Sequence, residues 1–179
     1  MALKPTIYKL RISLSNLDRN YYDTLNLTLA QHPSETLERM MVRVLAFCLH
    51  AHDSPNFTKG LSSVEEPDIW VHDLNNKIAL WIDVGEPAVD RIKKAARLAS
   101  AVEVYSFNSK SASWWKQEEA GFAKLSVSIF QFQWEAIKKL ANLVQRTMEI
   151  SITVTENSAY VSAESGECEI IWTSLQIRP

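Results

Sequence analysis

Two aspartates, Asp68 and Asp83, stand where the sequence predicts neighbouring strand ends. Residues 68–72 and 78–84 have the patterns of strands, and Asn75-Asn76 lies between them. Asparagine tolerates the left-handed backbone that a two-residue hairpin turn requires. Such a turn pairs residues whose numbers have the same sum as 75 and 76, and 68 and 83 have that sum. We therefore expect Asp68 to lie directly opposite Asp83.

Opposed carboxylates in a sheet have Cβ atoms about 5 Å apart and repel each other. A folded protein relieves that repulsion by sharing a proton or by binding a cation. Mg²⁺, or Mn²⁺ in its place, suits two carboxylates completed by waters and a substrate phosphate. The metal would polarise a phosphoryl oxygen and activate a water, and its binding should raise the thermal stability. The alternative is that both acids lie at a solvated sheet end and repel only weakly.

The same register gives each strand one apolar face. The apolar set is Ile69, Val71, Ile78, Leu80 and Ile82, and the opposite set is Asp68, Trp70, His72, Ala79, Trp81 and Asp83. A slip of one residue would turn the apolar set to the wrong face and move the aspartates out of opposition.

The rest of the pattern predicts a mixed α/β protein. Strands are expected over 7–14, 21–29, 102–107, 124–132, 149–155, 159–163 and 168–174. Apolar residues three and four apart predict a helix that starts at Pro33-Ser34-Glu35, with Ser34 as its cap, and ends near residue 50. Pro87 should open a second helix to about residue 100, and a third is expected over 134–148. This order implies a mixed β-sheet with flanking helices.

Three stretches of the sequence resemble the YaeQ family of bacterial proteins. They are His32-Pro33-Ser34-Glu35 with Arg39-Met40-Met41, then Glu66-Pro67-Asp68, then Trp81-Ile82-Asp83-Val84-Gly85 followed by Arg91-Ile92-Lys93-Lys94-Ala95. The opening Met1-Ala2-Leu3-Lys4 and the paired Trp114-Trp115 agree, so the likeness covers most of the chain. The resemblance implies a restriction-endonuclease-like core with extra N- and C-terminal strands and a variant of the PD-(D/E)XK nuclease motif.

Within that motif, Asp68 supplies the first acid and Asp83 the second. The motif's lysine should stand two residues after Asp83, but Gly85 occupies that position. Lys93 and Lys94 on the next helix are the candidates to return an ammonium group, which would position the attacking water or stabilise developing charge. A lysine beside an apolar stripe can equally extend over it and keep its charge in water.

The resemblance also implies a further metal-binding carboxylate from the first long helix. Glu35 and Glu38 are the candidates, as nucleases of this fold often use such a residue. Glu38 can instead pair with Arg39 or Arg43 in its own helix.

The composition fits one soluble, cytoplasmic domain over residues 1–179. Hydrophobic residues make up 46% and charged residues 22%, which is ordinary for a globular protein. The sequence has no apolar run long enough to cross a membrane and no visible signal peptide. The two cysteines form neither a disulfide framework nor a zinc spacing.

Positive charge gathers in the middle of the chain. Residues 91–124 contain seven Lys or Arg against three Glu, whereas residues 147–179 contain one Arg against five Glu. Lys110 and Arg91 are therefore the candidate nucleic-acid contacts, with Trp114-Trp115 near enough in sequence to stack on bases. The alternatives are a solvated helix face and a helix that buries one tryptophan in the core.

Two functions follow from these patterns. The first is a Mg²⁺-dependent phosphodiesterase acting on nucleic acid, with Asp68 and Asp83 as ligands and Lys93 or Lys94 as the cation. The second is a non-catalytic relative that keeps the fold and binds a protein or nucleic acid. The displaced lysine and the net charge of −2 favour the second, whereas the opposed acids and the local basic stretch favour the first. The oligomeric state stays open.

Overall fold

The computed structural model describes residues 3–179, and among these the chain forms strands and helices in alternation. The strands are β1 (Thr6–Asn16), β2 (Tyr21–Gln31), β3 (Asn56–Phe57), β4 (Ile69–His72), β5 (Ile78–Val84), β6 (Ala99–Ser106), β7 (Ser128–Phe132), β8 (Thr147–Thr155), β9 (Ser158–Ala163) and β10 (Gly166–Gln176). The α-helices are α1 (Leu37–Leu49), α2 (Val89–Leu98), α3 (Ser111–Phe122) and α4 (Trp134–Asn142), and two short 3₁₀ turns are η1 (Ala51–Asp53) and η2 (Gly60–Ser62). Among residues 3–179 no helix is long and apolar enough to span a bilayer.

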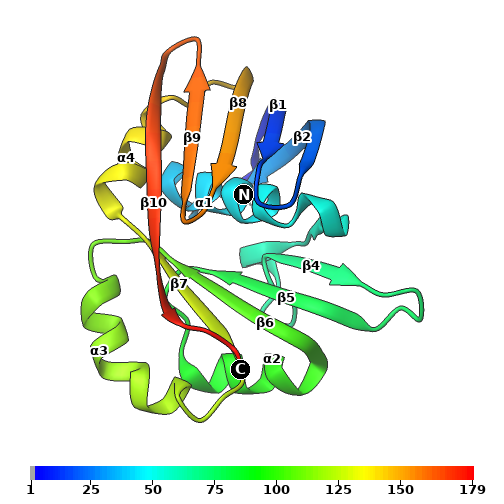
Figure 1. Cartoon of the computed structure of the whole chain (residues 1–179), viewed down its shortest axis with the longest axis vertical. Coiled ribbons are helices and arrows are strands. Elements are labelled where there is room, and N and C mark those ends of the chain that lie inside the picture. The colour runs from blue at the N-terminus through cyan, green and yellow to red at the C-terminus, as the bar shows by residue number, and fades with distance from the viewer. Residues whose placement is uncertain (1–2) are drawn as a thin grey trace.

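The strands form one mixed sheet in the order β2-β1-β8-β9-β10-β7-β6-β5-β4-β3. The long strand β10 joins two halves, because its first part pairs with β9 and its last part with β7. Figure 1 shows β10 running from the upper group of strands to the lower one. The predicted mixed sheet with flanking helices is confirmed, and the N- and C-terminal strands make up one half of it.

The two halves of the sheet are covered differently. One apolar cluster packs α1 and α4 against one face, and a second cluster packs α2 and α3 against the other face of the β4-to-β7 half. In the terminal half, β1 alternates between buried Leu10, Ile12 and Leu14 and exposed residues. This alternation is typical of a sheet with one face against a core and one face in water.

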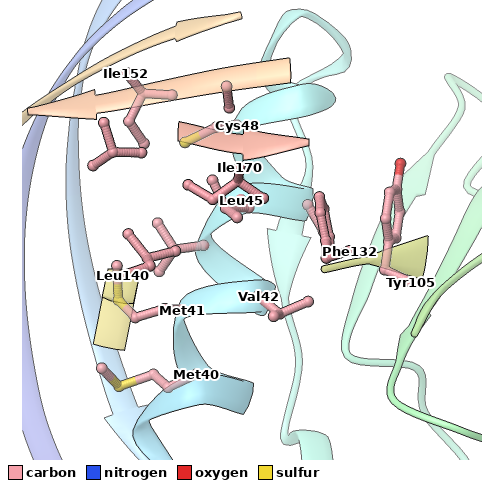
Figure 2. Packing of buried hydrophobic residues seen from close by; sticks show 14 of the residues in the cluster. Met40, Met41, Val42, Leu45, Cys48, Tyr105, Phe132, Leu140, Ile152 and Ile170 are labelled. Carbon is pink, nitrogen blue, oxygen red and sulfur yellow. The ribbon is translucent and has the colours of Figure 1, made fainter. Parts of the chain in front are cut away.

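Helix α1 lies in the centre of the main core. Eight of its 13 residues are buried, as expected of a helix with neighbours on several sides. Figure 2 shows Met41 and Leu45 among side chains from α4, β8 and β10. This packing fixes the position of the N-terminal end of α1, which reaches the candidate site.

The start of α1 differs from the sequence prediction. Thr36, rather than Ser34, is the N-cap: its hydroxyl accepts a hydrogen bond from the Arg39 N–H at 3.2 Å. Ser34 bonds to the His32 ring instead, at 2.6 Å. Both residue types are good caps, and the local bond to His32 removes Ser34 from that role.

The turn between β4 and β5 also differs from the prediction. The loop is longer than two residues, because the Asp73 carboxylate accepts hydrogen bonds from the backbone of Asn75 at 2.8 Å and Lys77 at 2.9 Å. A bulge then restores the predicted register: Ile69 pairs with Ile82 and Val71 with Leu80. As a result the faces expected for Ile78 and Ala79 are wrong, since Ile78 packs toward α2 and Ala79 toward the core around α1.

Several element ends lie away from their predicted positions. Helix α2 begins at Val89, with Ala88 as its N-cap, two residues after Pro87. Strand β7 begins at Ser128 rather than at residue 124. The segment before β7 is held as a loop, because the Gln176 side chain donates to the carbonyls of Phe122, Leu125 and Val127 at 2.9 to 3.1 Å. Helix α4 ends at Asn142 rather than at residue 148, and the Ser165 hydroxyl bonds to the Leu143 carbonyl just beyond that end.

Helix α3 carries Trp114 and Trp115, so the helix that the sequence offered as an alternative for this pair is present. The carboxylate of Glu86 accepts hydrogen bonds from the Phe107 and Asn108 amides, each at 3.1 Å, and from the Ser111 hydroxyl at 2.6 Å. These bonds hold the loop before α3 against the segment that follows β5. Because these partners are more than 20 residues from Glu86, no local sequence pattern predicts the hydrogen bonds.

Candidate functional site

Asp68 and Asp83 are neighbours at the same end of the β4–β5 pair. Ile69 pairs with Ile82, so the two aspartates are the next opposing residues, as the sequence predicts. Both are buried, with 4% and 2% exposure. They lie on the wall of one cavity, and their charges must therefore be compensated within the protein.

Asp68 is compensated by an arginine and a backbone amide. Arg39 Nη2 lies 2.8 Å from Asp68 Oδ1, and the Val84 N–H donates to Asp68 Oδ2 at 2.8 Å. Arg39 comes from the first turn of α1, so the buried core helix determines its position. Hydrogen bonds to an ionised group in such a setting are among the stronger ones in proteins.

Asp83 is compensated by Arg91 of α2. Arg91 Nε lies 2.6 Å from Asp83 Oδ2, Arg91 Nη2 lies 3.2 Å from Asp83 Oδ1, and the Trp81 indole N–H donates to Oδ1 at 3.1 Å. Burial raises the pKa of Asp83 above its ordinary value, and Arg91 offsets that rise only in part. Asp83 is thus a carboxylate that depends on its cation.

Arg91 also fixes the loop that lies over the cavity. Its Nη1 donates to the Val64 carbonyl at 2.7 Å and its Nη2 to the Glu66 carbonyl at 2.9 Å. The guanidinium therefore joins β5, α2 and the segment before β4. Most of its donors are used within the protein.

A second ion-pair group continues from Arg39 into α1. Glu35 lies 3.0 Å from Arg39 and accepts from Arg43 Nε and Nη2, both at 2.7 Å. Arg39 and Arg43 are one turn apart on α1 and so face the same side, and Glu35, just before the Thr36 N-cap, bonds to both. Glu35 is fully engaged by these two cations, and it does not turn toward Asp83.

The cations at the aspartates are not the predicted lysines. Lys93 and Lys94 are both exposed, and over residues 3–179 no lysine ammonium lies within salt-bridge distance of Asp68 or Asp83. Lys94 lines a smaller hollow beside Arg91 and Trp81, whereas Lys93 lies on the outer side of α2. The expected lysine contact is therefore wrong, and a catalytic part for either residue stays a prediction.

The other candidates are dispersed. Glu38 is half-buried on α1 and forms no ion pair with Arg39 or Arg43 among the described residues. Lys110 is exposed at the start of α3 and does not line the cavity, whereas Arg91 does. Trp114 and Trp115 are half-buried and pack against Phe122, which supports the core interpretation of this pair.

A divalent metal at Asp68 and Asp83 would compete with groups that already bond to both carboxylates. Each of the four carboxylate oxygens of Asp68 and Asp83 already accepts at least one N–H from the protein. Two guanidinium groups stand where a metal would bring its charge. Within residues 3–179 no cluster of three or more His, Cys, Asp or Glu side chains is arranged for a metal.

The cavity next to the aspartates has a volume of about 500 Å³. Phe107 and Trp134 line one part of it, with ring centroids 6.2 Å apart, and Arg39 and Arg91 line another. Gly85, at the position of the motif's lysine, has φ +114 and open space where a Cβ would stand. The cavity is thus a mixed aromatic and charged concavity of the size of a small ligand.

The sequence interpretation missed Arg39, Glu86 and Trp134. For Arg39 a signal existed, because Glu35, Arg39 and Arg43 follow one another at intervals of four on one helix face. For Glu86 and Trp134 no local signal exists, since their roles depend on segments far away in the sequence. Arg91 was chosen as a nucleic-acid contact, and its bond to Asp83 was not foreseen.

A second polar group lies away from the cavity. The Glu103 carboxylate accepts from the Tyr105 hydroxyl at 2.7 Å and contacts His50 Nε2 at 2.8 Å. Burial alone would raise the pKa of Glu103, but the bonds from His50 and Tyr105 outweigh it and lower the pKa. Tyr105 stacks on Phe132, as Figure 2 shows, so this group joins the core to the end of α1.

Comparison with known proteins gives consistent matches. Residues 1–172 match the family model described as YaeQ protein. The uncharacterised YaeQ proteins of Salmonella typhi and Escherichia coli (strain K12) are 39% and 37% identical, each over 98% of both chains. The crystal structure of a YaeQ protein from Xanthomonas axonopodis pv. citri superposes with a TM-score of 0.92 at 33% identity and covers 97% of this chain and 99% of that one. A Pseudomonas syringae YaeQ structure has a TM-score of 0.91 at 30% identity and covers 96% of each chain.

Proposed function

The chain belongs to the YaeQ family, and from that premise and the geometry of its cavity we propose that it binds nucleic acid without cleaving it. The nuclease-like fold that the family resemblance implies would then serve recognition. Asp68 and Asp83 would be structural charges, each held by its own arginine.

The observation that carries this proposal is the complete pairing of both aspartates. A metal would have to displace Arg39 and Arg91 from the carboxylates, and Arg39, which is 17% exposed, would keep only Glu35 as an ion-pair partner among the described residues. Removing one member of a buried ion pair costs roughly 3–5 kcal/mol, because the other charge remains buried. The metal would also have to lose bound water molecules. The two arginines are therefore the more favourable partners for the two carboxylates.

The aromatic lining favours nucleic acid as the ligand over a protein partner. Trp134 is half-buried at the start of α4, with the Lys138 ammonium 5.8 Å from its ring centroid, and Phe107 lies beside it. Aromatic side chains stack on unpaired bases and contribute about 1–3 kcal/mol per base. The cavity volume of about 500 Å³ admits one base with its sugar rather than a folded protein surface.

Binding of a labelled single-stranded oligonucleotide in EDTA tests this function. Trp134→Leu keeps an apolar side chain at the start of α4, and it should weaken binding by roughly tenfold. Tyr22→Ala is the control, because Tyr22 is an exposed aromatic residue on β2, away from the cavity. Equal affinities for both variants and the wild type, or no binding in EDTA, would rule out the proposal.

The second candidate function is a Mg²⁺- or Mn²⁺-dependent nuclease using Asp68 and Asp83, with Lys93 or Lys94 as its cation. The position of both acids on one cavity wall favours it. It requires Arg39 and Arg91 to leave the carboxylates. Millimolar metal should then raise the melting temperature, and the double change Asp68→Asn with Asp83→Asn should abolish both that rise and any cleavage. Cleavage that survives the double change would exclude this site.

A further inference from the structure

A second cavity lies on the other side of Arg39. It has a volume of about 440 Å³ and is formed by the end of β2, the approach to α1 and the segment around η2. It shares Arg39, Gly60 and Leu61 with the first cavity, so the two are adjacent. None of the residues that the sequence singled out for nucleic-acid contact lines it.

The charge of the second cavity is opposite to that of the first. Its lining carries three cations, Arg39, Arg43 and Lys59, against the single anion Glu35, an excess of two positive charges. The first cavity carries Arg39 and Arg91 against four carboxylates, an excess of two negative charges. Its carboxylates are Glu66, Asp68, Asp83 and Glu86. A phosphate group is therefore attracted to the second cavity, whereas the first suits an uncharged group such as a base.

Arg43 gives the second cavity a preorganised donor. Its side chain is only 7% exposed, and Glu35 holds its Nε and Nη2 while the Phe57 ring lies 5.7 Å from the guanidinium carbon. Among residues 3–179 its Nη1 has no hydrogen-bond partner. A guanidinium fixed on one side and free on the other can bind an anion with little further loss of freedom.

Lys59 supplies a second, mobile charge at the same cavity. Its side chain is exposed, and within the described part of the chain its ammonium forms no ion pair. Its backbone N–H donates to Glu66 at 3.2 Å, which ties the segment to the loop over the first cavity. Lys59 can therefore bind an anion without breaking an existing contact.

We propose that the cavity between β2, the start of α1 and η2 binds a phosphate group through Arg43 and Lys59. The inference deepens the proposed function, on which it rests, because a backbone phosphate there would continue a strand whose base lies in the first cavity. A free phosphorylated small molecule would offer the same chemistry. In either case the donors are charged groups that suit a tetrahedral anion.

Inorganic phosphate is the first probe, titrated at constant ionic strength while the amide resonances of Thr58, Lys59 and Gly60 are followed by NMR. These resonances should shift in the wild type and in the control Lys77→Gln, which removes an exposed lysine from the β4–β5 turn. Lys59→Gln should bind phosphate roughly five- to tenfold more weakly. Arg43→Lys, checked for folding by circular dichroism, should weaken it further. No phosphate shift, or equal affinities for Lys59→Gln and Lys77→Gln, would overturn the inference.

A competition experiment separates the two sources and the two proposals. If phosphate displaces the labelled oligonucleotide and Lys59→Gln weakens both ligands, the site holds a backbone phosphate. If phosphate binds without displacing the oligonucleotide, the site serves a free phosphorylated molecule. If phosphate binds and Trp134→Leu has no effect on the oligonucleotide, the phosphate site stands while the base-binding function fails.

Discussion

At the scale of single residues, two arginines define the charge balance of the candidate site. A lysine at the position of Gly85 would need a backbone φ of +114, and residues other than glycine rarely adopt that conformation. Space is available there, so the obstacle is the backbone and not crowding. The positive charge instead comes from Arg39 and Arg91, which approach the aspartates from two different helices.

Removal of Arg91 should destabilise the protein through Asp83. In Arg91→Gln, Asp83 would keep its burial and lose its cation, and we expect a loss of about 2–3 kcal/mol, below the usual range for a buried pair because Arg91 is 33% exposed. The pKa of Asp83 is raised in the folded state, so the folded protein binds a proton there more readily than the unfolded chain does. A protonated Asp83 no longer needs a cation, and the loss of stability should therefore shrink as the pH falls through that pKa. Urea unfolding at several pH values measures both effects.

Arg97→Gln is the matched control for that variant. Arg97 is an exposed arginine on the same helix without an ion pair among the described residues, and its removal should change the stability by less than about 0.5 kcal/mol. Equal stabilities of the two variants would mean that the Arg91–Asp83 pair contributes nothing.

The pKa of Glu103 is shifted in the opposite direction to that of Asp83. Its folded-state pKa is lowered, so its contribution to stability is present above the ordinary pKa of 4.5 and is lost as the pH falls through the lower folded-state value. The difference in unfolding free energy between the wild type and Glu103→Gln should therefore shrink between about pH 6 and about pH 3. Exposed Glu149→Gln should show a small difference throughout. A difference for Glu103→Gln that grows on acidification would contradict this account.

At the scale of elements, the start of α1 decides where Arg39 stands. Thr36→Ala removes the N-cap bond to the Arg39 amide and should cost roughly 1 kcal/mol, whereas Ser34→Ala should cost less. Thermal unfolding of the two variants makes the comparison. A larger loss for Ser34→Ala would restore the cap that the sequence alone suggested.

The elements also show how far local patterns reach. The β4–β5 register was predictable because Ile69, Val71, Leu80 and Ile82 share one face, although a longer loop and a bulge replace the predicted two-residue turn. Neither the Asp73 turn nor the bulge could be foreseen, because both arise from local hydrogen bonds that compete with a regular hairpin. The hydrogen bonds that Glu86 accepts from the loop before α3 and from Ser111 could not be predicted, because these partners lie more than 20 residues from Glu86.

At the scale of the whole molecule, the sequence predicted the mixed sheet and its flanking helices but not the order of the strands. Alternation identifies β1 and β8 as strands, but nothing in either sequence says that they pair side by side in parallel. The same limit applied to the site. The pair Asp68 and Asp83 follows from one hairpin, whereas Arg39 and the second cavity need α1 and β2 to be placed first.

The shared strand β10 should make the two halves of the sheet unfold together. Ile170 is fully buried in β10, and Ile170→Ala should cost roughly 2–5 kcal/mol. Hydrogen exchange should then accelerate by the same factor at Ile152 in β8 and at Val104 in β6, because both amides open with the global transition. Acceleration confined to β8 would mean that the halves open separately.

The parallel pairing of β1 with β8 has a consequence for the chain as it is synthesised. Lys9 pairs with Thr147, so the inner edge of the β1–β2 hairpin has no partner until nearly the whole polypeptide has left the ribosome. At about 5–20 residues per second, that edge waits for several seconds. An unpaired strand edge invites association with other chains. The nascent β1–β2 hairpin is therefore the part of this protein that we expect a chaperone to bind. Ribosome-bound chains that end before β8 should bind a chaperone more strongly than chains that include β8.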